Sequence, residues 1–267
     1  MKAFGKLMQR ACANFLAQRI LEKVVSKCHR LMGIGSGGDV FASGERAVIE
    51  LMAARCNPPY CVLDVGSNTG QFLSLLLAIL DRELLNVHCF EPGFTAFSVL
   101  RQKTAEEARI RMNNLGLSSE RGERVLFYDR PGSPLASLTR RRLDHFGIQL
   151  EHSENVKLDT LDNYCFENKL ERIHLLKVDV EGHEMEVLRG GEVIFSSNAI
   201  EMVLFEFGGC NIDTRTFLQD FFYFFREQHM NLYRITPSGY LYPLESYKEM
   251  QEQFITTNFL AMRGALH

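Results

Sequence analysis

V-L-D-V-G-S-N-T-G, residues 62–70, is the stretch of this chain that decides its fold. The apolar run ends at an acid, Asp64, and a loop bracketed by Gly66 and Gly70 follows it. From Gln71 to Leu80 the apolar residues recur at the spacing of an amphipathic helix. Strand, tight turn and helix in this order predict a local structure that binds a nucleotide-like cofactor.

Asp64 distinguishes between two kinds of cofactor. A dinucleotide such as NAD brings a pyrophosphate to the backbone amides of the turn, and a carboxylate there would repel it. S-adenosylmethionine has no phosphate and carries a sulfonium and an ammonium group, so it suits the turn better. Glu91, which closes the second predicted strand, can accept hydrogen bonds from ribose hydroxyls in either case. Asp64 therefore favours S-adenosylmethionine, and an NAD-dependent oxidoreductase is the remote alternative.

The bulk composition is that of an ordinary globular chain. Its 267 residues are 46% hydrophobic and 24% charged, and the net charge of −3 gives no basic field for nucleic acid. Seven cysteines, none in a C-x-x-C pair, argue against a metal ribbon and a disulfide framework and favour a reducing compartment. The sequence has no apolar run of about 18 residues, the length that a transmembrane helix needs. We therefore expect a cytoplasmic protein.

The N-terminal segment differs from the remainder in charge. Four cations precede its first acid, Glu22, and its apolar residues fall at helical spacing. We predict a helical extension over residues 1–32, followed by a catalytic domain over residues 33–267. Three roles stay open for the extension: packing on the domain or on a partner subunit, resting on an anionic membrane surface, and organelle targeting.

Strands and helices alternate in the predicted catalytic domain. With short connections, this alternation predicts a parallel sheet with helices on both faces, and ligands of such sheets bind at the carboxyl ends of the strands. Asp64, Glu91, Asp179 and Glu206 all lie at or next to the ends of predicted strands. Because repulsion among four carboxylates needs cations or protons to offset it, we predict the functional site at this edge of the sheet.

The loop D-V-E-G-H-E, residues 179–184, follows the most apolar predicted strand and faces the group to be transferred. Methyl transfer to a hydroxyl requires an aligned acceptor oxygen and a base for its proton. His183, Asp179 and Glu181 are the catalytic candidates. For His183 the alternative is a helix-start residue that hydrogen-bonds a neighbouring carboxylate. Asp179 and Glu206 also offer oxygen ligands to a divalent metal ion, but we do not predict one.

Five segments carry a more specific signal: V-L-D-V-G-S-N-T-G-Q-F, C-F-E-P, N-N-L-G-L-S, V-K-L-D-T-L-D-N-Y and, above all, L-L-K-V-D-V-E-G-H-E-M-E-V-L-R-G-G. Together they resemble the FkbM family of S-adenosylmethionine-dependent methyltransferases, from about Gly33 to Ala261. The resemblance implies an α/β, Rossmann-like class I methyltransferase fold. Its sheet would be mostly parallel and seven-stranded, with helices on both faces and an antiparallel last strand.

The resemblance also implies the roles of site residues. Asp64, Gly66, Asn68 and Gly70 would surround the methionine part of the cofactor, Glu91 would hold the ribose, and Leu117 would lie by the adenine. Ser67, Pro92 and Asp179 complete the predicted cofactor site. On the substrate side we expect Ser137, Arg141 and Glu206, since S-P-L-A-S-L-T-R-R-R-L-D-H resembles the acceptor-side region of the family. The arginines of that segment, residues 140–142, have two alternative roles: a solvated helical face, or part of a lid that holds an anionic acceptor such as a uronate or a phosphate.

These observations lead to one function hypothesis and its alternatives. Family members typically O-methylate sugars, so we expect an O-methyltransferase that acts on a hydroxyl of a sugar or glycan precursor. A secondary metabolite or a lipid-linked compound is the alternative acceptor, because loops rather than the fold decide the acceptor. A cofactor-binding scaffold without turnover is a further possibility.

Overall fold

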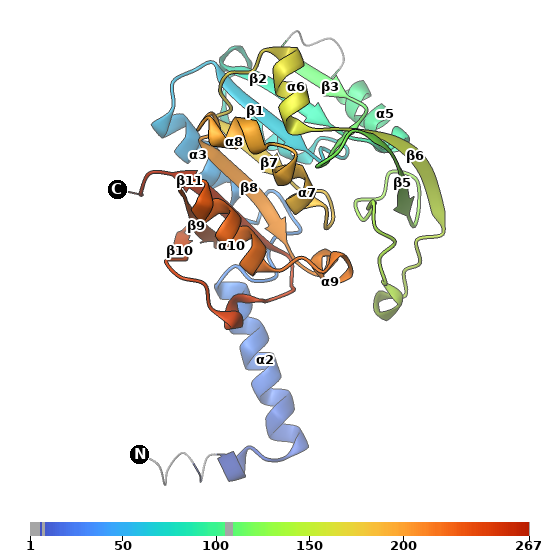
Figure 1. The fold of residues 1–267 in the computed structure, drawn as a ribbon. Coiled ribbons are helices and arrows are strands. Elements are labelled where there is room, and N and C mark those ends of the chain that lie inside the picture. Colours follow the sequence, from blue (N-terminus) through green and yellow to red (C-terminus); the bar gives the residue numbers. More distant parts are fainter. Residues whose placement is uncertain (1–5, 7–8, 105–108, 267) are drawn as a thin grey trace.

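A computed structural model describes residues 6, 9–104 and 109–266 (Figure 1). In this part of the chain the main sheet has eight strands, in the spatial order β10-β9-β11-β8-β7-β1-β2-β3. Five neighbouring strands run parallel: β3 (Ile110–Asn113), β2 (Leu85–Phe90), β1 (Tyr60–Val65), β7 (Leu175–Val178) and β8 (Met202–Phe207). Three strands complete the sheet through antiparallel pairings: β11 (Thr257–Arg263), β9 (Met230–Ile235) and β10 (Leu241–Pro243).

This sheet confirms the predicted mostly parallel α/β fold, and its last strand, β11, is antiparallel as expected. The predicted number of seven strands is wrong, because β10 adds an eighth at the edge next to β9. A turn joins the two strands, in which the Thr236 N–H donates to the Tyr240 carbonyl oxygen at 3.0 Å. No strand pattern is visible in this segment of the sequence, because β10 has three residues and buries only Leu241.

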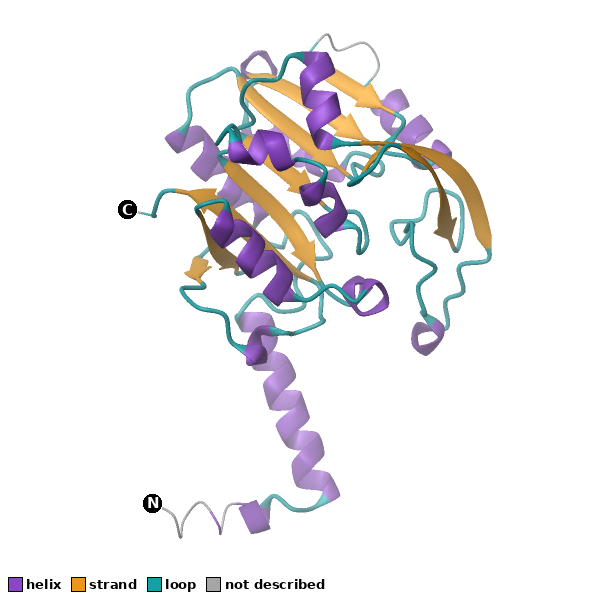
Figure 2. Ribbon diagram, viewed as in Figure 1, coloured by secondary structure: helices purple, strands orange, loops and turns teal. Residues whose placement is uncertain are grey.

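Helices cover both faces of the main sheet, as Figure 2 shows. One face packs against three helices: α3 (Glu45–Arg55), α4 (Gln71–Ile79) and α5 (Phe94–Lys103). The opposite face packs against four: α6 (Leu161–Asn168), α7 (Glu184–Arg189), α8 (Glu192–Ser196) and α10 (Leu218–Glu227). Because both faces are covered, every residue of β1 and of β7 is buried, which explains their nearly continuous apolar sequences.

A second, smaller sheet stands beside the first and was not predicted. Its strands lie in the order β4 (Gly116–Leu117), β6 (His152–Asp159) and β5 (Gly122–Tyr128). Residues 129–151 connect β5 to β6, and we call this segment the flap; it contains the short helix η2 (Asp144–Phe146). The sequence did not reveal β6, because only Val156 and Leu158 of its eight residues are buried.

The N-terminal helix α2 (Phe15–Leu31) projects away from the two sheets (Figure 1). Asn14 caps it by accepting a hydrogen bond from the Ala17 N–H at 3.0 Å. The predicted helix over residues 1–32 also covers residues 1–5, 7 and 8, which lie outside the described part of the chain. The predicted boundary between residues 32 and 33 stays a prediction. No described helix combines the length and the hydropathy needed to cross a bilayer.

Candidate active site

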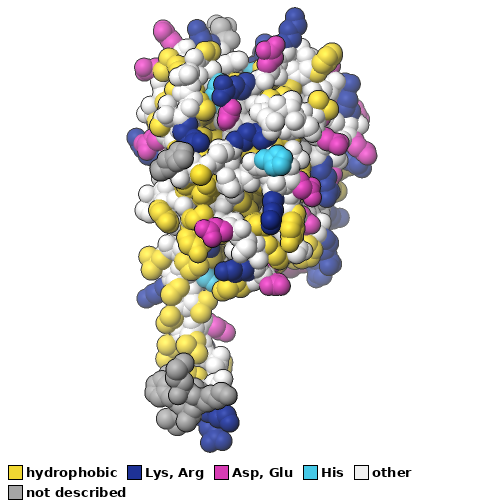
Figure 3. All heavy atoms as spheres, turned by 60° about the vertical axis from the view of Figure 1, so that its left-hand side comes forward, with side chains coloured by type: hydrophobic (Ala, Val, Ile, Leu, Met, Phe, Trp, Pro, Cys, Tyr) yellow, Lys and Arg dark blue, Asp and Glu magenta, His cyan; other side chains and the backbone are white. Residues whose placement is uncertain are grey.

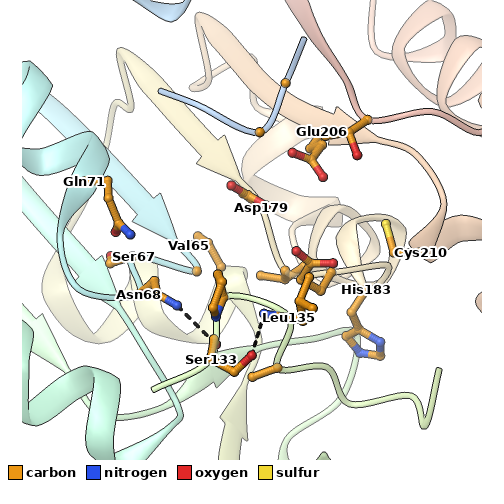
Figure 4. Close-up of a pocket in the computed structure, with 18 of the residues that line it drawn as sticks. Val65, Ser67, Asn68, Gln71, Ser133, Leu135, Asp179, His183, Glu206 and Cys210 are labelled. Carbon is orange, nitrogen blue, oxygen red and sulfur yellow. Dashed lines mark hydrogen bonds between the residues drawn. The ribbon is translucent and has the colours of Figure 1, made fainter. Parts of the chain in front are cut away.

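A cavity of about 640 Å³ lies at the carboxyl ends of β1, β2, β7 and β8 (Figure 4). The loops that follow these strands form its floor, and the flap and residues 37–41 form part of its wall. This is the position at which open parallel sheets bind their ligands. Its size falls in the usual range for small-molecule sites.

The loop between β1 and α4 approaches its neighbour too closely for any residue but glycine. Gly66 has a φ of +85°, and a Cβ atom there would lie 1.8 Å from the carbonyl oxygen of Asp179. Ser67 Oγ donates to the Asp64 carbonyl oxygen at 2.7 Å, and the Asn68 N–H donates to the Glu91 carboxylate at 2.9 Å. These contacts hold the loop in one conformation before any ligand binds.

Glu91 is buried at the end of β2, and both its carboxylate oxygens accept backbone hydrogen bonds. One oxygen accepts from Asn68 N–H, and the other accepts from Gly93 N–H at 2.8 Å. Burial raises the pKa of Glu91 to about 7, although these two hydrogen bonds oppose the shift. Each oxygen can accept a second hydrogen bond, so the side chain can still bind two ribose hydroxyls.

Asp64 lies beneath the glycine loop and does not line the cavity. It is fully buried, and neither carboxylate oxygen has a hydrogen-bond partner. Lys177 Nζ lies 3.9 Å from Asp64 and donates to Asp179 Oδ2 at 3.0 Å. Burial raises the pKa of Asp64, and Lys177 opposes that shift. Because Lys177 is a counter-ion for Asp64, Asp64 would repel a pyrophosphate less than an unpaired acid would, and it distinguishes S-adenosylmethionine from NAD less sharply than expected.

Three carboxylates meet at one side of the cavity. Asp179, Glu181 and Glu206 each place an oxygen within 4.8 Å of the others. Burial, together with the neighbouring carboxylates, raises the pKa of Glu206 well above its usual range. Burial and Asp179 likewise raise the pKa of Glu181. Protons relieve the repulsion in this acidic cluster, whose oxygens are also of the kind that Mg²⁺ or Ca²⁺ prefers.

The flap is attached to the loop that carries Glu181. Ser137 Oγ donates to the Glu181 carbonyl oxygen at 2.8 Å, and the Arg141 guanidinium pairs with the Glu181 carboxylate. Arg141 also lies 3.7 Å from Asp213 in α9 (Cys210–Thr214), and its side chain is only 8% exposed. Arg141 is therefore not part of a solvated helical face, and two carboxylates already face its charge.

His183 lines the cavity just before α7. Its Nε2 atom lies 3.0 Å from the Ser118 hydroxyl, which directly follows β4. This partner is a hydroxyl, whereas the alternative interpretation of His183 expected a carboxylate. Burial lowers the pKa of His183, so its ring is neutral at pH 7.

The structure brings most predicted site residues together around the cavity. They are Gly66, Ser67, Asn68, Glu91, Pro92, Leu117, Arg141, Asp179, Glu181, His183 and Glu206. Three predicted residues lie behind the cavity wall. Asp64 is under the glycine loop, Gly70 precedes α4, and Ser137 faces the backbone of Glu181.

The region that contains these residues matches a family model. Residues 64–233, more than half of the chain, match the methyltransferase FkbM domain. The chain belongs to the FkbM methyltransferase family. The match confirms the resemblance seen in the motifs and, with the strand order above, the class I methyltransferase fold.

Several known proteins are similar to this FkbM chain. The 2-O-methyltransferase NoeI of Sinorhizobium fredii is 27% identical over 157 residues, which cover 55% of this chain and 62% of NoeI. The hexuronic acid methyltransferase AglP of Haloferax volcanii is 29% identical over 163 residues, which cover 61% of this chain and 60% of AglP. The match thus spans under two thirds of each relative. The crystal structure of the methyltransferase FkbM of Methylobacillus flagellatus aligns at 13% identity and a TM-score of 0.46, covering 81% of this chain and 47% of that one.

The FkbM family implies S-adenosylmethionine as the cofactor, and the residues of this site fit it. The close approach at Gly66 keeps the loop free of side-chain bulk beside the cavity. Glu91 offers acceptors for ribose hydroxyls, and Asp179 offers one for an amino group. Leu117 and Pro92 add apolar surface of the kind that an adenine ring needs.

Several residues of this FkbM site were not predicted from the sequence. Lys177 could have been predicted, because it is a lone cation inside the apolar strand I-H-L-L-K-V-D-V and such a buried charge needs a partner of opposite charge. Ser133 gave no signal: its carbonyl oxygen accepts from Asn68 Nδ2 at 3.3 Å across a long stretch of chain. Phe41, exposed at the rim of the cavity, lies in a loop without any periodic pattern.

Proposed function

We propose that this protein is an S-adenosylmethionine-dependent O-methyltransferase that acts on a hydroxyl of a sugar or glycan precursor. The family supports methyl transfer, and the names of NoeI and AglP support a sugar acceptor. The observation that carries the proposal is the position of the acidic cluster, which shares one cavity with the glycine loop and Glu91.

The proposed chemistry divides between the cofactor and the chain. When bound, the cofactor supplies a methyl group on a positively charged sulfur. The chain has to orient the acceptor oxygen and accept its proton, and a positioned base typically accelerates such a step by about 10²–10⁴-fold. The raised pKa values of Glu181 and Glu206 make their carboxylates stronger bases than ordinary glutamates. We therefore assign proton uptake to the acidic cluster.

His183 is the second candidate base in this proposal. Its neutral ring can accept a proton, but Nε2 is within hydrogen-bond distance of Ser118 Oγ. The assignment to the cluster predicts that Glu181→Gln lowers kcat strongly and that His183→Ala lowers it weakly, with cofactor affinity preserved in both variants. A strong loss in His183→Ala alone would instead make His183 the base.

The charges of the cavity support an uncharged acceptor. Two cations line the cavity, and carboxylates already face both: Glu181 and Asp213 face Arg141, and Asp179 faces Lys177. Among the described residues that line the cavity, no lysine or arginine without a partner carboxylate remains for a uronate carboxylate, whereas a neutral hydroxyl-rich sugar needs none. Glycosides of hexoses are therefore better acceptors than uronates in this proposal.

The same proposal includes the cellular compartment of the protein and the domain boundaries of its chain. All seven cysteines are free, and four of them are buried, which supports the reducing cytoplasm. Residues 33–267 form the catalytic domain, and residues 1–32 form an extension.

The proposal is tested by incubating the full chain with S-adenosylmethionine and a panel of neutral and uronic glycosides. Mass spectrometry should find acceptors heavier by one CH₂, with more product from the neutral sugars, and S-adenosylmethionine but not NAD should raise the Tm. The Asp179→Asn variant is the inactive control, and it should form no methylated product. Methylation confined to acceptors without a sugar, or stabilisation by NAD alone, would overturn the proposal.

A further inference from the structure

Helix α2 exposes an apolar surface that the body of the protein does not cover (Figures 1 and 3). None of its residues is buried. The large apolar side chains of α2 and its C-cap are between 41% and 81% exposed: Phe15, Leu16, Ile20, Leu21, Val24, Val25, Leu31 and Met32. A continuous apolar surface of this kind marks an interaction site.

The apolar and basic residues of α2 occupy different sides. Apolar positions 20, 21, 24, 25, 28, 31 and 32 repeat at spacings of three and four, so they form one stripe along the helix. The cations at positions 19, 23, 27 and 30 follow the same spacings along the neighbouring side. Glu22 is the single acid within α2. An apolar stripe flanked by cations is the pattern of helices that lie in a membrane interface.

Charge separates this segment from the body. Residues 1–32 contain seven lysines and arginines and one acid, a net charge of +6. Since the whole chain carries −3, residues 33–267 carry −9. An anionic surface would therefore attract the helix and repel the body. The helix, and not the body, is the part of the molecule that can contact such a surface.

The base of α2 is attached to the body beside the candidate active site. Arg234 Nε donates to the Met32 carbonyl oxygen at 2.8 Å, and Ile34 is buried. Ile255 lines the active-site cavity and also a second hollow, of about 500 Å³, between the body and α2. The base of α2 therefore lies next to the wall of the active-site cavity.

We propose that α2 attaches the protein peripherally to an anionic membrane surface, with its apolar stripe among the acyl chains and its cations against lipid phosphates. The helix has 17 residues and is about 25 Å long, and its basic side faces lipid headgroups when the helix lies along the surface. Charge favours this occupant over a second copy, because two paired α2 helices, each with four cations and one acid, would bring two net charges of +3 together.

The test is co-sedimentation of the full chain with vesicles of phosphatidylcholine alone and vesicles that also contain phosphatidylglycerol. We expect binding to the anionic vesicles only, and release by added salt. Replacing Arg19, Lys23 and Lys27 with glutamine should weaken binding by about a hundredfold. The matched control replaces Lys157, Lys169 and Arg226, exposed on the body, and should bind like the parent chain.

A second variant, Ile20→Gln with Val24→Gln, removes two residues of the stripe and should also lose binding, while its Tm shows that the body stays folded. Equal binding to both vesicles would overturn the charge argument. No binding to either vesicle would overturn the proposal. If light scattering then finds a dimer that this second variant dissociates, α2 binds a second copy. None of these measurements depends on methyl transfer.

Discussion

Replacing Lys177 with methionine should destabilise the protein, because it leaves Asp64 as a buried carboxylate without a counter-ion. Lys177 Nζ lies 3.9 Å from Asp64, and neither Asp64 oxygen has a hydrogen bond to replace that interaction. Asp179, the other partner of Lys177, has a side chain that is 33% exposed and can regain water. The cost therefore falls mainly on Asp64.

The magnitude follows from the separation and the burial of the pair. At an effective dielectric constant of about 20, two charges about 4 Å apart attract each other by about 4 kcal/mol. Removing one partner of a buried pair costs about 3–5 kcal/mol in unfolding free energy, because the remaining charge stays desolvated. Since domains are stable by about 5–15 kcal/mol, the Lys177→Met variant should fold but unfold at much lower urea concentration.

Urea unfolding of three proteins at about pH 8 checks this reasoning: the parent chain, Lys177→Met, and Lys177→Met combined with Asp64→Asn. The double variant has no buried charge at position 64 and should be more stable than the single variant by about 2 kcal/mol. Lowering the pH should also rescue the single variant, because Asp64 then becomes protonated. If the double variant is no more stable than the single one, Lys177 does not compensate Asp64.

Two further predictions concern Glu45 and Gly66. Burial raises the pKa of Glu45 from 4.5 to about 7, so the folded state holds a proton that the unfolded state releases, and stability falls as the pH rises through this range. Because glutamine does not titrate, the Glu45→Gln variant should lose about 3 kcal/mol less unfolding free energy than the parent chain between about pH 5 and pH 8, as measured by urea unfolding. If the difference in unfolding free energy between the two proteins is the same at every pH, the prediction is wrong. Gly66→Ala should cost more than about 2 kcal/mol and abolish cofactor binding by calorimetry, because its Cβ would meet the Asp179 carbonyl oxygen. Gly147→Ala is the control: its φ is also positive, but a Cβ there meets nothing within 4 Å, and equal losses in both variants would disprove the close approach.

The parallel part of the fold could be predicted because its signals are local. β1 and β7 are buried on both faces, which forces an apolar run, and Gly66 marks the tight turn. β6 could not be predicted in the same way. Most of its residues face solvent, so its sequence looks like a loop, and its pairing with β5 and β4 depends on residues far away in the chain.

The same distinction holds for the candidate site. Glu91, Asp179 and Glu206 lie at strand ends, so the topology alone places them at one edge of the sheet. The pairing of the buried Asp64 with Lys177 and the pairing of Arg141 on the flap with Glu181 could not be predicted in this way. Such side-chain partners arise from tertiary packing, which no short motif encodes.

The attachment of the flap links access to the cavity with proton exchange. Arg141 lies on the flap and Glu181 on the loop after β7, and the guanidinium opposes the rise in the pKa of Glu181. Any motion that carries the flap outward removes the guanidinium, which lowers the pKa of Glu181, and also part of the burial, which raises it, so the proton affinity of Glu181 changes. Entry and exit of ligands past the flap would then be accompanied by proton uptake and release, so the opening equilibrium of this protein should depend on pH even when no reaction takes place.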